Sequence, residues 1–304
     1  MIGQDLMIPT LTLMRPMTTG LSLDFAAGRY RSGGIDLAGL AGVPGWSFSR
    51  TGAGAAATSA GALASFPNGT PRITDRGLLL ETPARTNKLT LFSANPPDLT
   101  GMTKNGDAAA TLTLVTDTAA LAAAGLSGLV TGGQVWKLDN SAGSASANAA
   151  ASGSVGNTNP HSLSVWVRGS GSSVRVRLSS VTSTIFAPSA AYAWITTPNL
   201  SPTGSGDQWS IWCAAGSVAW FILPGLEEAA TSGSPIVTTG ASATRGAEAA
   251  AVITPVGCTR WTATFGSSGT TSGAGLTAGA GFDLVTGRPW IGLGNELKTL
   301  EFLP

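Results

Sequence analysis

Short segments in which apolar and polar residues alternate recur along much of the chain. A period of two is typical of a strand with one face in a core and the other in solvent. Two such segments are consecutive, HSLSVWVRG (161–169) and SSVRVRLSS (172–180), and they are predicted to form an antiparallel hairpin with one solvent-facing side. Further strands are expected at 21–25, 110–117, 132–141, 192–200 and 208–228. Together these segments predict an all-β protein built around a two-sheet β-sandwich.

Turn and breaker residues predict three other features. PRITDRGLLLE (71–81) indicates a hairpin, because a Thr-Asp-Arg-Gly turn joins two short apolar runs. DTAALAAAGLSGL (117–129) is the main candidate for a helix, although its apolar residues are mostly Ala. PIVTTGASATRGAEAA (235–250) is predicted to be a linker that leaves the sandwich.

Both ends of the chain are predicted to depend on other surfaces. Residues 1–20 alternate apolar residues with Thr and contain Pro9 and Pro16, which favours an extended arm. Residues 246–304 are predicted to form a small β-rich C-terminal module, and a segment of this length holds only a thin core by itself. The candidates for that core are Trp261, Phe265, Phe282 and Trp290.

Composition and charge narrow the class of protein. Nine Trp and nine Phe along the chain indicate a folded protein despite 41 Gly. The 17 Lys plus Arg nearly balance 16 Asp plus Glu, and no basic run is present, which argues against binding to a nucleic-acid backbone. Only 11% of residues are charged, so we expect partners to bury much of the surface. Neither a secretory signal nor a membrane span is expected, and Cys213 and Cys258 are predicted to be buried free thiols.

The residues needed for common enzyme chemistry are sparse. The single histidine, His161, is predicted to be a surface residue at a strand end, so no nucleophile triad or transition-metal site is expected. Glu227 and Glu228 are adjacent, and in a strand their side chains would point to opposite faces. Two possibilities stay open: a structural Ca²⁺ at Asp107 or Asp139, and a meeting of carboxylates in space. The candidates for such a meeting are Asp24, Glu81 and Asp207.

Four side chains on the polar faces of two strands are the candidate binding site. Trp166 and Arg168 lie on one predicted strand, and Arg175 and Arg177 lie on the next. An indole flanked by guanidinium groups suits a sugar ring, and it also suits packing against a neighbouring subunit. The subunit interpretation is favoured, because Trp and Arg are both enriched at protein interfaces.

Two motifs flank the predicted sandwich. RGLLLETPARTNKL (76–89) resembles the signature R-G-L-L-I-E-x-A-R-T-N-L-L of spike, fibre and tail-associated proteins of tailed bacteriophages. WFILPGLEEAATSGSPIVTTGASATRGAE (220–248) resembles the companion signature W-G-A-Q-L-E-E-G-x-x-x-T-S-Y-I-P-T-T-G-x-x-V-T-R-A-A-D. Between them, HSLSVWVRG is similar to the family's strand Y-T-F-S-V-W-V-K. Pro83 is an insertion in the first motif, and it is predicted to fix a bend before the sandwich starts at Arg85–Lys88.

The resemblance implies an architecture in four parts. These are an extended arm (1–20), a β-rich virion-attachment region (21–85), a jelly-roll sandwich similar to carbohydrate-binding modules (86–245) and the C-terminal module (246–304). It also implies a non-enzymatic structural protein of a virion, located in a spike, fibre or tail and assembled in the host cytoplasm. Its partners would be capsid, tail or spike subunits.

In that role the sandwich would bind host-surface polysaccharide or carry further spike subunits. Two alternatives stay open, a structural connector without sugar binding and a glycan depolymerase. Fibres and spikes of the family are commonly trimeric, so a homotrimer is expected, with arms and C-terminal modules packed around a common axis. No cofactor, metal, nucleic acid or membrane insertion is expected.

Overall fold

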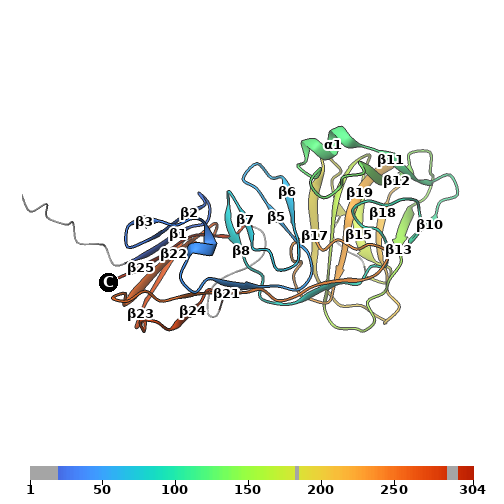
Figure 1. Ribbon diagram of the computed structural model, residues 1–304. Coiled ribbons are helices and arrows are strands. Elements are labelled where there is room, and N and C mark those ends of the chain that lie inside the picture. The colour runs from blue at the N-terminus through green and yellow to red at the C-terminus, as the bar shows by residue number, and fades with distance from the viewer. Residues whose placement is uncertain (1–19, 182–184, 286–293) are drawn as a thin grey trace, which may run out of the picture.

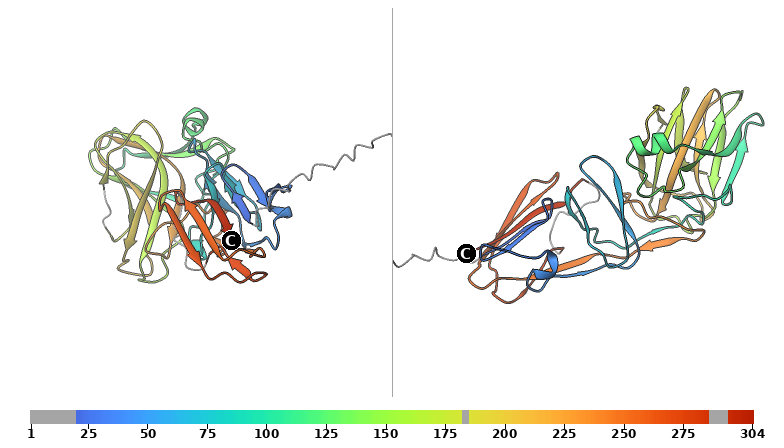
Figure 2. Two further views of the ribbon diagram at one scale, coloured as in Figure 1. Left: turned by 90° about the vertical axis from the view of Figure 1, so that its left-hand side faces the viewer. Right: turned by 45° about the horizontal axis from the view of Figure 1, so that its top comes forward.

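The structure is a computed structural model that describes residues 20–181, 185–285 and 294–304. Figures 1 and 2 show a terminal lobe, which carries the C-terminus, at one end and a β-sandwich at the other. Nearly all of the regular structure is β, so the prediction of an all-β protein with a sandwich is confirmed. The predicted arm, apart from Gly20, and the core candidate Trp290 lie outside the described residues.

The sandwich consists of two antiparallel sheets, here called sheet A and sheet B. The strands of sheet A are β9 (Arg85–Asn87), β11 (Thr111–Thr116), β12 (Gln134–Asn140), β14 (His161–Ser170), β17 (Ala193–Leu200), β19 (Ser217–Glu227) and β20 (Ala243–Arg245). The strands of sheet B are β10 (Met102–Gly106), β13 (Ala147–Ala151), β15 (Val174–Leu178), β16 (Ile185–Phe186) and β18 (Trp209–Cys213). The order is β11-β12-β19-β14-β17 in sheet A, where β9 joins β19 to β20, and β10-β13-β18-β15-β16 in sheet B.

The facing sides of the two sheets enclose one hydrophobic core. Trp136 and Phe221 of sheet A stack with their ring centroids 5.7 Å apart, and Trp209 of sheet B lies 6.0 Å from Phe221. Val174 and Val176 of β15 alternate into the same core and are buried. Burial of each of these side chains stabilises the fold by about 1.5–3 kcal/mol. This accounts for the alternation of buried and half-buried residues in β15.

The terminal lobe contains a larger and a smaller sheet. The larger one, here called the terminal sheet, consists of β1 (Leu21–Asp24), β2 (Arg29–Ser32), β3 (Ile35–Asp36), β7 (Arg72–Thr74), β8 (Gly77–Leu79), β22 (Arg260–Phe265), β23 (Thr270–Ala274) and β25 (Leu297–Leu303). The smaller one consists of β4 (Ser47–Ser49), β21 (Ala249–Ile253) and β24 (Gly281–Asp283). A 3₁₀ turn, η1 (Leu40–Gly42), connects β3 to β4.

The two ends of the chain build this lobe together. β25 pairs with β1, where Leu21 lies opposite Phe302, and also with β8, where Leu297 lies opposite Leu78. Residues 21–85 and 246–304 were expected to form two separate regions, whereas strands from both join in one sheet. The pairing spans nearly the whole chain, and a local pattern carries no information about it.

One hydrophobic core lies under the strands from both ends. Phe265 and Phe282 are buried in it as expected, and Trp261 packs against it. The N-terminal segment contributes Leu23 and Phe25 to the same core. The C-terminal segment is therefore covered by its own chain, and the size argument for a partner surface no longer applies to it.

Several shorter elements were also predicted from the sequence or complete the fold. β7 and β8 form the predicted hairpin, with Thr74 opposite Gly77. The predicted helix is present but short, as α1 (Thr118–Ala123). A second hairpin, β5 (Gly54–Ala57) with β6 (Leu63–Phe66), packs against the segment after α1, where the amide of Leu63 donates to Gly125 O at 2.7 Å. Both cysteines are buried, as predicted.

Candidate functional site

The four predicted site residues lie on opposite outer faces of the sandwich. Trp166 and Arg168 belong to β14 in sheet A, and Arg175 and Arg177 belong to β15 in sheet B. The predicted hairpin of 161–169 with 172–180 is therefore wrong. Both segments do alternate toward one core, but they reach it from opposite sheets, and alternation alone cannot distinguish a neighbouring strand from a facing one.

On sheet A, the Arg168 guanidinium contacts side chains of its own chain. Arg168 Nε donates to Asp117 Oδ2 at 2.8 Å, and the Tyr192 hydroxyl donates to the same oxygen at 2.8 Å. The Arg168 guanidinium also lies 4.1 Å from the ring centroid of Trp220. Burial, followed by the bond to Asp117, raises the pKa of Tyr192 above its ordinary value. These contacts pair the Arg168 charge with a carboxylate and two aromatic rings of its own chain.

Trp166 packs beside this group. Its ring centroid lies 5.6 Å from that of Trp194, its cross-strand neighbour on β17. Its Nε1 is buried without an acceptor among the described residues. Trp166 is half-buried and packs against Trp194 with the two rings tilted by 41°, which suits packing better than an open sugar platform.

On sheet B the two arginines have fewer partners. The Arg175 guanidinium lies 4.9 Å from the ring centroid of Trp212 on β18. Arg177 donates to two backbone carbonyls of its own segment, Leu178 O at 3.1 Å and Ser179 O at 2.6 Å. Within the described residues, neither arginine forms an ion pair with a carboxylate.

Trp212 was not expected as a neighbour of Arg175. The period of two in WSIWC (209–213) carries the signal, because Trp209, Ile211 and Cys213 face the core and Trp212 faces outward. The alignment of Trp212 with Arg175 depends on the strand register, which only the structure supplies.

The two motifs that flank the sandwich meet at the junction of the lobes. Glu81 of the first motif forms an ion pair with Arg245 of the second at 2.9 Å. Arg72 Nη1 pairs with Glu81 at 2.6 Å, and Arg72 Nε donates to Glu248 Oε1 at 2.8 Å. Arg50 Nη1 reaches the same Glu248 oxygen at 2.8 Å. We call these five buried residues the ion cluster.

The ion cluster changes the interpretation of the segment that follows the sandwich. Residues 235–250 do lead out of the sandwich, as predicted for a linker, but Arg245 and Glu248 within them are buried in the cluster. Burial of a charge is costly unless it is paired and hydrogen-bonded. The ion pairs to the 50–81 segment meet that requirement, so this stretch is a structural part of the junction.

Backbone pairing continues the junction into sheet A. β9 pairs with β19 and β20, with Asn87 opposite both Glu227 and Ala243. The Asn87 side chain donates to Pro224 O and Ile236 O, each at 3.0 Å, and it accepts from the Leu226 amide at 3.1 Å. The residues after Pro83 therefore enter the sandwich where they were expected, and a single side chain binds the entering strand to the leaving one.

His161 was predicted at the surface, and this prediction is wrong. The residue is buried beside the junction, with Nδ1 2.7 Å from Asn159 O and Nε2 3.3 Å from Lys88 Nζ. Lys88 Nζ also donates to Glu228 Oε2 at 2.8 Å. Lys88 of the first motif packs against the start of β14, which was predicted to be exposed to solvent.

The two adjacent glutamates differ as expected for a strand. Glu227 is buried, whereas Glu228 is more exposed and pairs with Lys88. Burial raises the pKa of Glu227 to about 7, against the opposing effect of Arg85, whose Nη1 lies 3.8 Å away. Burial alone would also raise the pKa of Glu81, but Arg245 and Arg72 outweigh it and lower that pKa to about 2. The junction thus contains two carboxyl groups with opposite pKa shifts.

The other carboxylates have local structural partners. Asp107 accepts from the amides of Ala109 and Ala145 at 2.8 and 2.7 Å, and Asp139 pairs with Lys137 at 2.8 Å. Across the described ranges no group of three or more His, Cys, Asp or Glu residues could hold a metal ion.

The carboxylates that were left open for a meeting in space have separate partners. Asp24 accepts from the Ala27 amide at 2.8 Å, and Asp207 accepts from the Thr203 amide at 3.0 Å. Glu81 is bound within the ion cluster. These three side chains belong to the terminal sheet, to a loop of the sandwich and to the junction, respectively.

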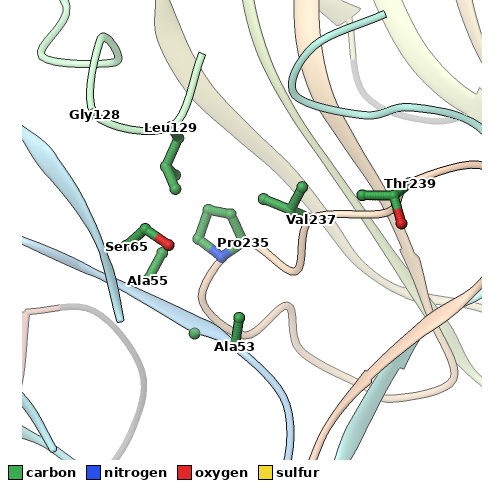
Figure 3. A pocket seen from close by; sticks show the side chains of 9 residues that line it. Ala53, Ala55, Ser65, Gly128, Leu129, Pro235, Val237 and Thr239 are labelled. Atoms are coloured by element: carbon green, nitrogen blue, oxygen red, sulfur yellow. The ribbon is translucent and has the colours of Figure 1, made fainter. Parts of the chain in front are cut away.

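A cavity of about 250 Å³ lies between the β5–β6 hairpin and the sandwich (Figure 3). Its lining is small and mostly apolar: Ala53, Gly54, Ala55, Ser65, Gly128, Leu129, Pro235, Val237 and Thr239. None of these side chains carries a charge, so the lining contains no carboxylate or amine that could act as an acid or base. Its hydroxyl groups are those of Ser65 and Thr239. Within the parts of the chain that are described, no helix has the length and apolar character needed to cross a bilayer.

Comparison with protein-family models gives no match to this chain, and comparison with curated proteins gives none either.

Proposed function

We propose that this chain is a structural protein of a bacteriophage or phage-like gene transfer particle, which attaches through its terminal lobe and displays a sandwich of the carbohydrate-binding-module type. One observation carries the proposal: the described ends of the chain lie together, with Leu21 paired to Phe302, and the sandwich lies at the opposite end of the molecule (Figure 1). A protein that must be anchored at one end and must present a module at the other needs this arrangement. The two motifs that resemble virion proteins form the junction between these ends.

The rigidity of the junction supports a display role. The entering and leaving strands are joined by the ion cluster and by Asn87, and none of these contacts depends on an exposed loop. Buried, paired charges fix one geometry, because any displacement leaves a charge without its partner. A displayed module held in this way keeps a defined orientation on a particle surface.

The location is tested on particles released by the strain that carries the gene. Purified particles are probed with an antibody against the sandwich by immunoblot and by immunogold electron microscopy. We expect the chain to copurify with particles and the label to lie at their periphery. Absence of the chain from density-purified particles would contradict the virion role.

Within that role, the sandwich either binds host-surface glycan or serves as a connector. The glycan role is the one we propose, because sheet B has cations without carboxylate partners among the described residues, whereas Arg168 on sheet A is paired with Asp117 of its own chain. A glycan array probed with the full chain separates the two roles. Binding to a surface polysaccharide is expected, and absence of binding to every sugar would favour the connector. A control assay for release of reducing ends checks the expected lack of depolymerase activity.

We also propose that copies associate as a homotrimer. The low charge of the surface supports association, since little repulsion keeps copies apart. Light scattering of the purified chain checks this, and the expected result is the mass of three chains. A mass of one chain at all concentrations would contradict the trimer and would favour single attachment of each copy to another virion protein.

A further inference from the structure

A row of polar and aromatic side chains crosses the outer face of sheet B. In register, Asn105 of β10 lies opposite Asn148 of β13, which lies opposite Trp212 of β18, which lies opposite Arg175 of β15. Because neighbouring strands lie about 4.8 Å apart, the row extends about 14 Å. It ends at Ile185 of β16, whose side chain is 50% exposed. We call Asn105, Asn148, Trp212 and Arg175 the sheet B row.

The sheet B row has hydrogen-bonding capacity that the protein leaves unused. Within the described residues the Arg175 guanidinium donates no hydrogen bond, and it lies 4.9 Å from the Trp212 ring centroid. Its Nε is buried without an acceptor among those residues. Asn105 Nδ2 makes long contacts of 3.4 Å with Asn148 Oδ1 and with Thr103 O. The side-chain amides and the two terminal Arg175 nitrogens, which are not among the buried atoms, therefore have hydrogen-bonding capacity for an external ligand.

The positions beside the row carry small side chains at their centre, where Ser210 is buried. The neighbouring register positions are Arg177, Ser210, Ala150 and Thr103, and the two central side chains among them are small. An extended chain could thus lie along the row against one side of the Trp212 indole, with the amides at one end and guanidinium groups at the other. This combination of one aromatic surface with a few placed polar groups is typical of ligand sites.

Charge selects the class of ligand. On the outer face of sheet A, Arg168 pairs with Asp117 and Lys137 pairs with Asp139, each at 2.8 Å. On sheet B, Arg175 and Arg177 have no carboxylate partner within the described parts of the chain. Guanidinium groups bind carboxylate and phosphate groups through paired hydrogen bonds. An acidic ligand would supply the charge that sheet B lacks.

We propose that the sheet B row, together with Arg177, binds an acidic oligosaccharide, a sugar chain that carries carboxylate or phosphate groups. The inference rests on the proposed glycan-display function and assigns it a face, a ligand charge and residues. Arg175 and Arg177 would bind the acidic groups, Trp212 would pack against a sugar ring, and Asn105 and Asn148 would bind hydroxyl groups. Trp166 and Arg168 on sheet A would have no part in this site.

The test measures binding of the full chain to surface polysaccharide extracted from the strain that carries the gene. The polysaccharide is used in three forms: native, carboxyl-reduced, and dephosphorylated with hydrofluoric acid. We expect retention of the native form and at least a tenfold loss of affinity after one of the two treatments, which identifies the acidic group. We also expect affinity to fall as salt is raised, since the attraction is screened.

Variants assign the face. Arg175→Met is expected to lower affinity for the native polysaccharide at least tenfold, and Asn148→Ala at least threefold. Neither variant is expected to change the midpoint of thermal unfolding. Lys137→Met, on the outer face of sheet A, is the matched control and is expected to bind as the parent does. If Arg175→Met binds like the parent, the site is not on sheet B and the inference is overturned.

The remaining outcomes separate this inference from the proposed function. Equal binding to native, carboxyl-reduced and dephosphorylated polysaccharide would overturn the acidic-ligand assignment and leave glycan display standing. Binding to no sugar would overturn both the inference and the glycan role, but the immunogold result on particles would still decide the virion role. Tighter binding to single-stranded DNA than to any polysaccharide would also overturn the inference. Such binding is not expected, because the chain has a net charge of only +1.

Discussion

Arginine is used in two different ways at the junction and on the outer face of sheet B. Arg72 is fully buried, and its three side-chain nitrogens all donate, to groups that include Glu81, Glu248 and Ala55 O. Arg175 is half-buried and has one ring contact and no hydrogen-bond acceptor within the described residues. An arginine therefore stabilises the fold where its hydrogen-bond acceptors come from its own chain. It can bind a ligand where its own chain supplies no acceptor.

Removal of the central arginine of the ion cluster tests the first half of this comparison most strongly. Arg72→Met leaves Glu248 and Glu81 buried with fewer partners, and loss of one member of a buried ion pair costs about 3–5 kcal/mol. Chemical denaturation should show this loss in the free energy of unfolding. Arg175→Met is the matched control, and its unfolding free energy should lie within about 0.5 kcal/mol of the parent's. Equal effects of the two substitutions would remove the distinction.

The pH dependence of stability tests the two shifted carboxyl groups. The folded pKa of Glu227, about 7, lies above its ordinary value of 4.5, so its stabilising contribution is complete below pH 4.5 and is lost as pH rises through 7. A rise from 4.5 to about 7 corresponds to about 3 kcal/mol. Glu81 behaves oppositely, because its contribution is present above pH 4.5 and is lost as pH falls toward about 2.

These two groups together predict maximal stability of the junction near pH 4.5 to 5. Glu227→Gln should flatten the decline between pH 5 and pH 8, measured by denaturation at each pH. Glu228→Gln is the control, since this more exposed neighbour has its pKa lowered by Lys88 and does not titrate in that window. A decline that persists in Glu227→Gln would show that another group causes it.

Two asparagines provide a comparison without charge. Asn87→Ala removes the side chain that bonds three backbone groups of the leaving segment and leaves those groups buried, which should cost about 2 kcal/mol. Asn105→Ala on the sheet B row should leave the unfolding free energy nearly unchanged and should weaken polysaccharide binding. A stability loss in both variants would mean that the row is part of the folded framework.

The smallest expected effect concerns the two outer faces. Arg168→Met breaks a partly buried pair with Asp117 and should cost about 1 kcal/mol without an effect on sugar affinity. Thermal unfolding measures the loss of stability, and polysaccharide binding by the same preparation measures the sugar affinity. Loss of affinity in this variant would place the ligand on sheet A.

The sequence by itself determined the class of the fold and the location of the strands with clear alternation, but not of those in small-residue stretches such as β5, β6 and β13. Alternation such as that of Val174 and Val176 against Arg175 depends on local chemistry, because each residue must meet either a core or solvent, and the structure places these side chains as expected. The same was true of the hairpin at 71–81 and of the buried cysteines. The four candidate site residues were also correctly placed on solvent-facing positions, although half-buried ones.

Only the tertiary structure decided which strands are neighbours. It separated 161–170 from 174–178 into two sheets, paired Leu21 with Phe302, and brought Glu81 to Arg245. The physical reason is that strand pairing and ion pairing between distant segments depend on the total burial and satisfaction of groups across the fold, and a local period is the same for every such arrangement. The alignment of Trp212 with Arg175 is one result of that choice, and the candidate binding face depends on it.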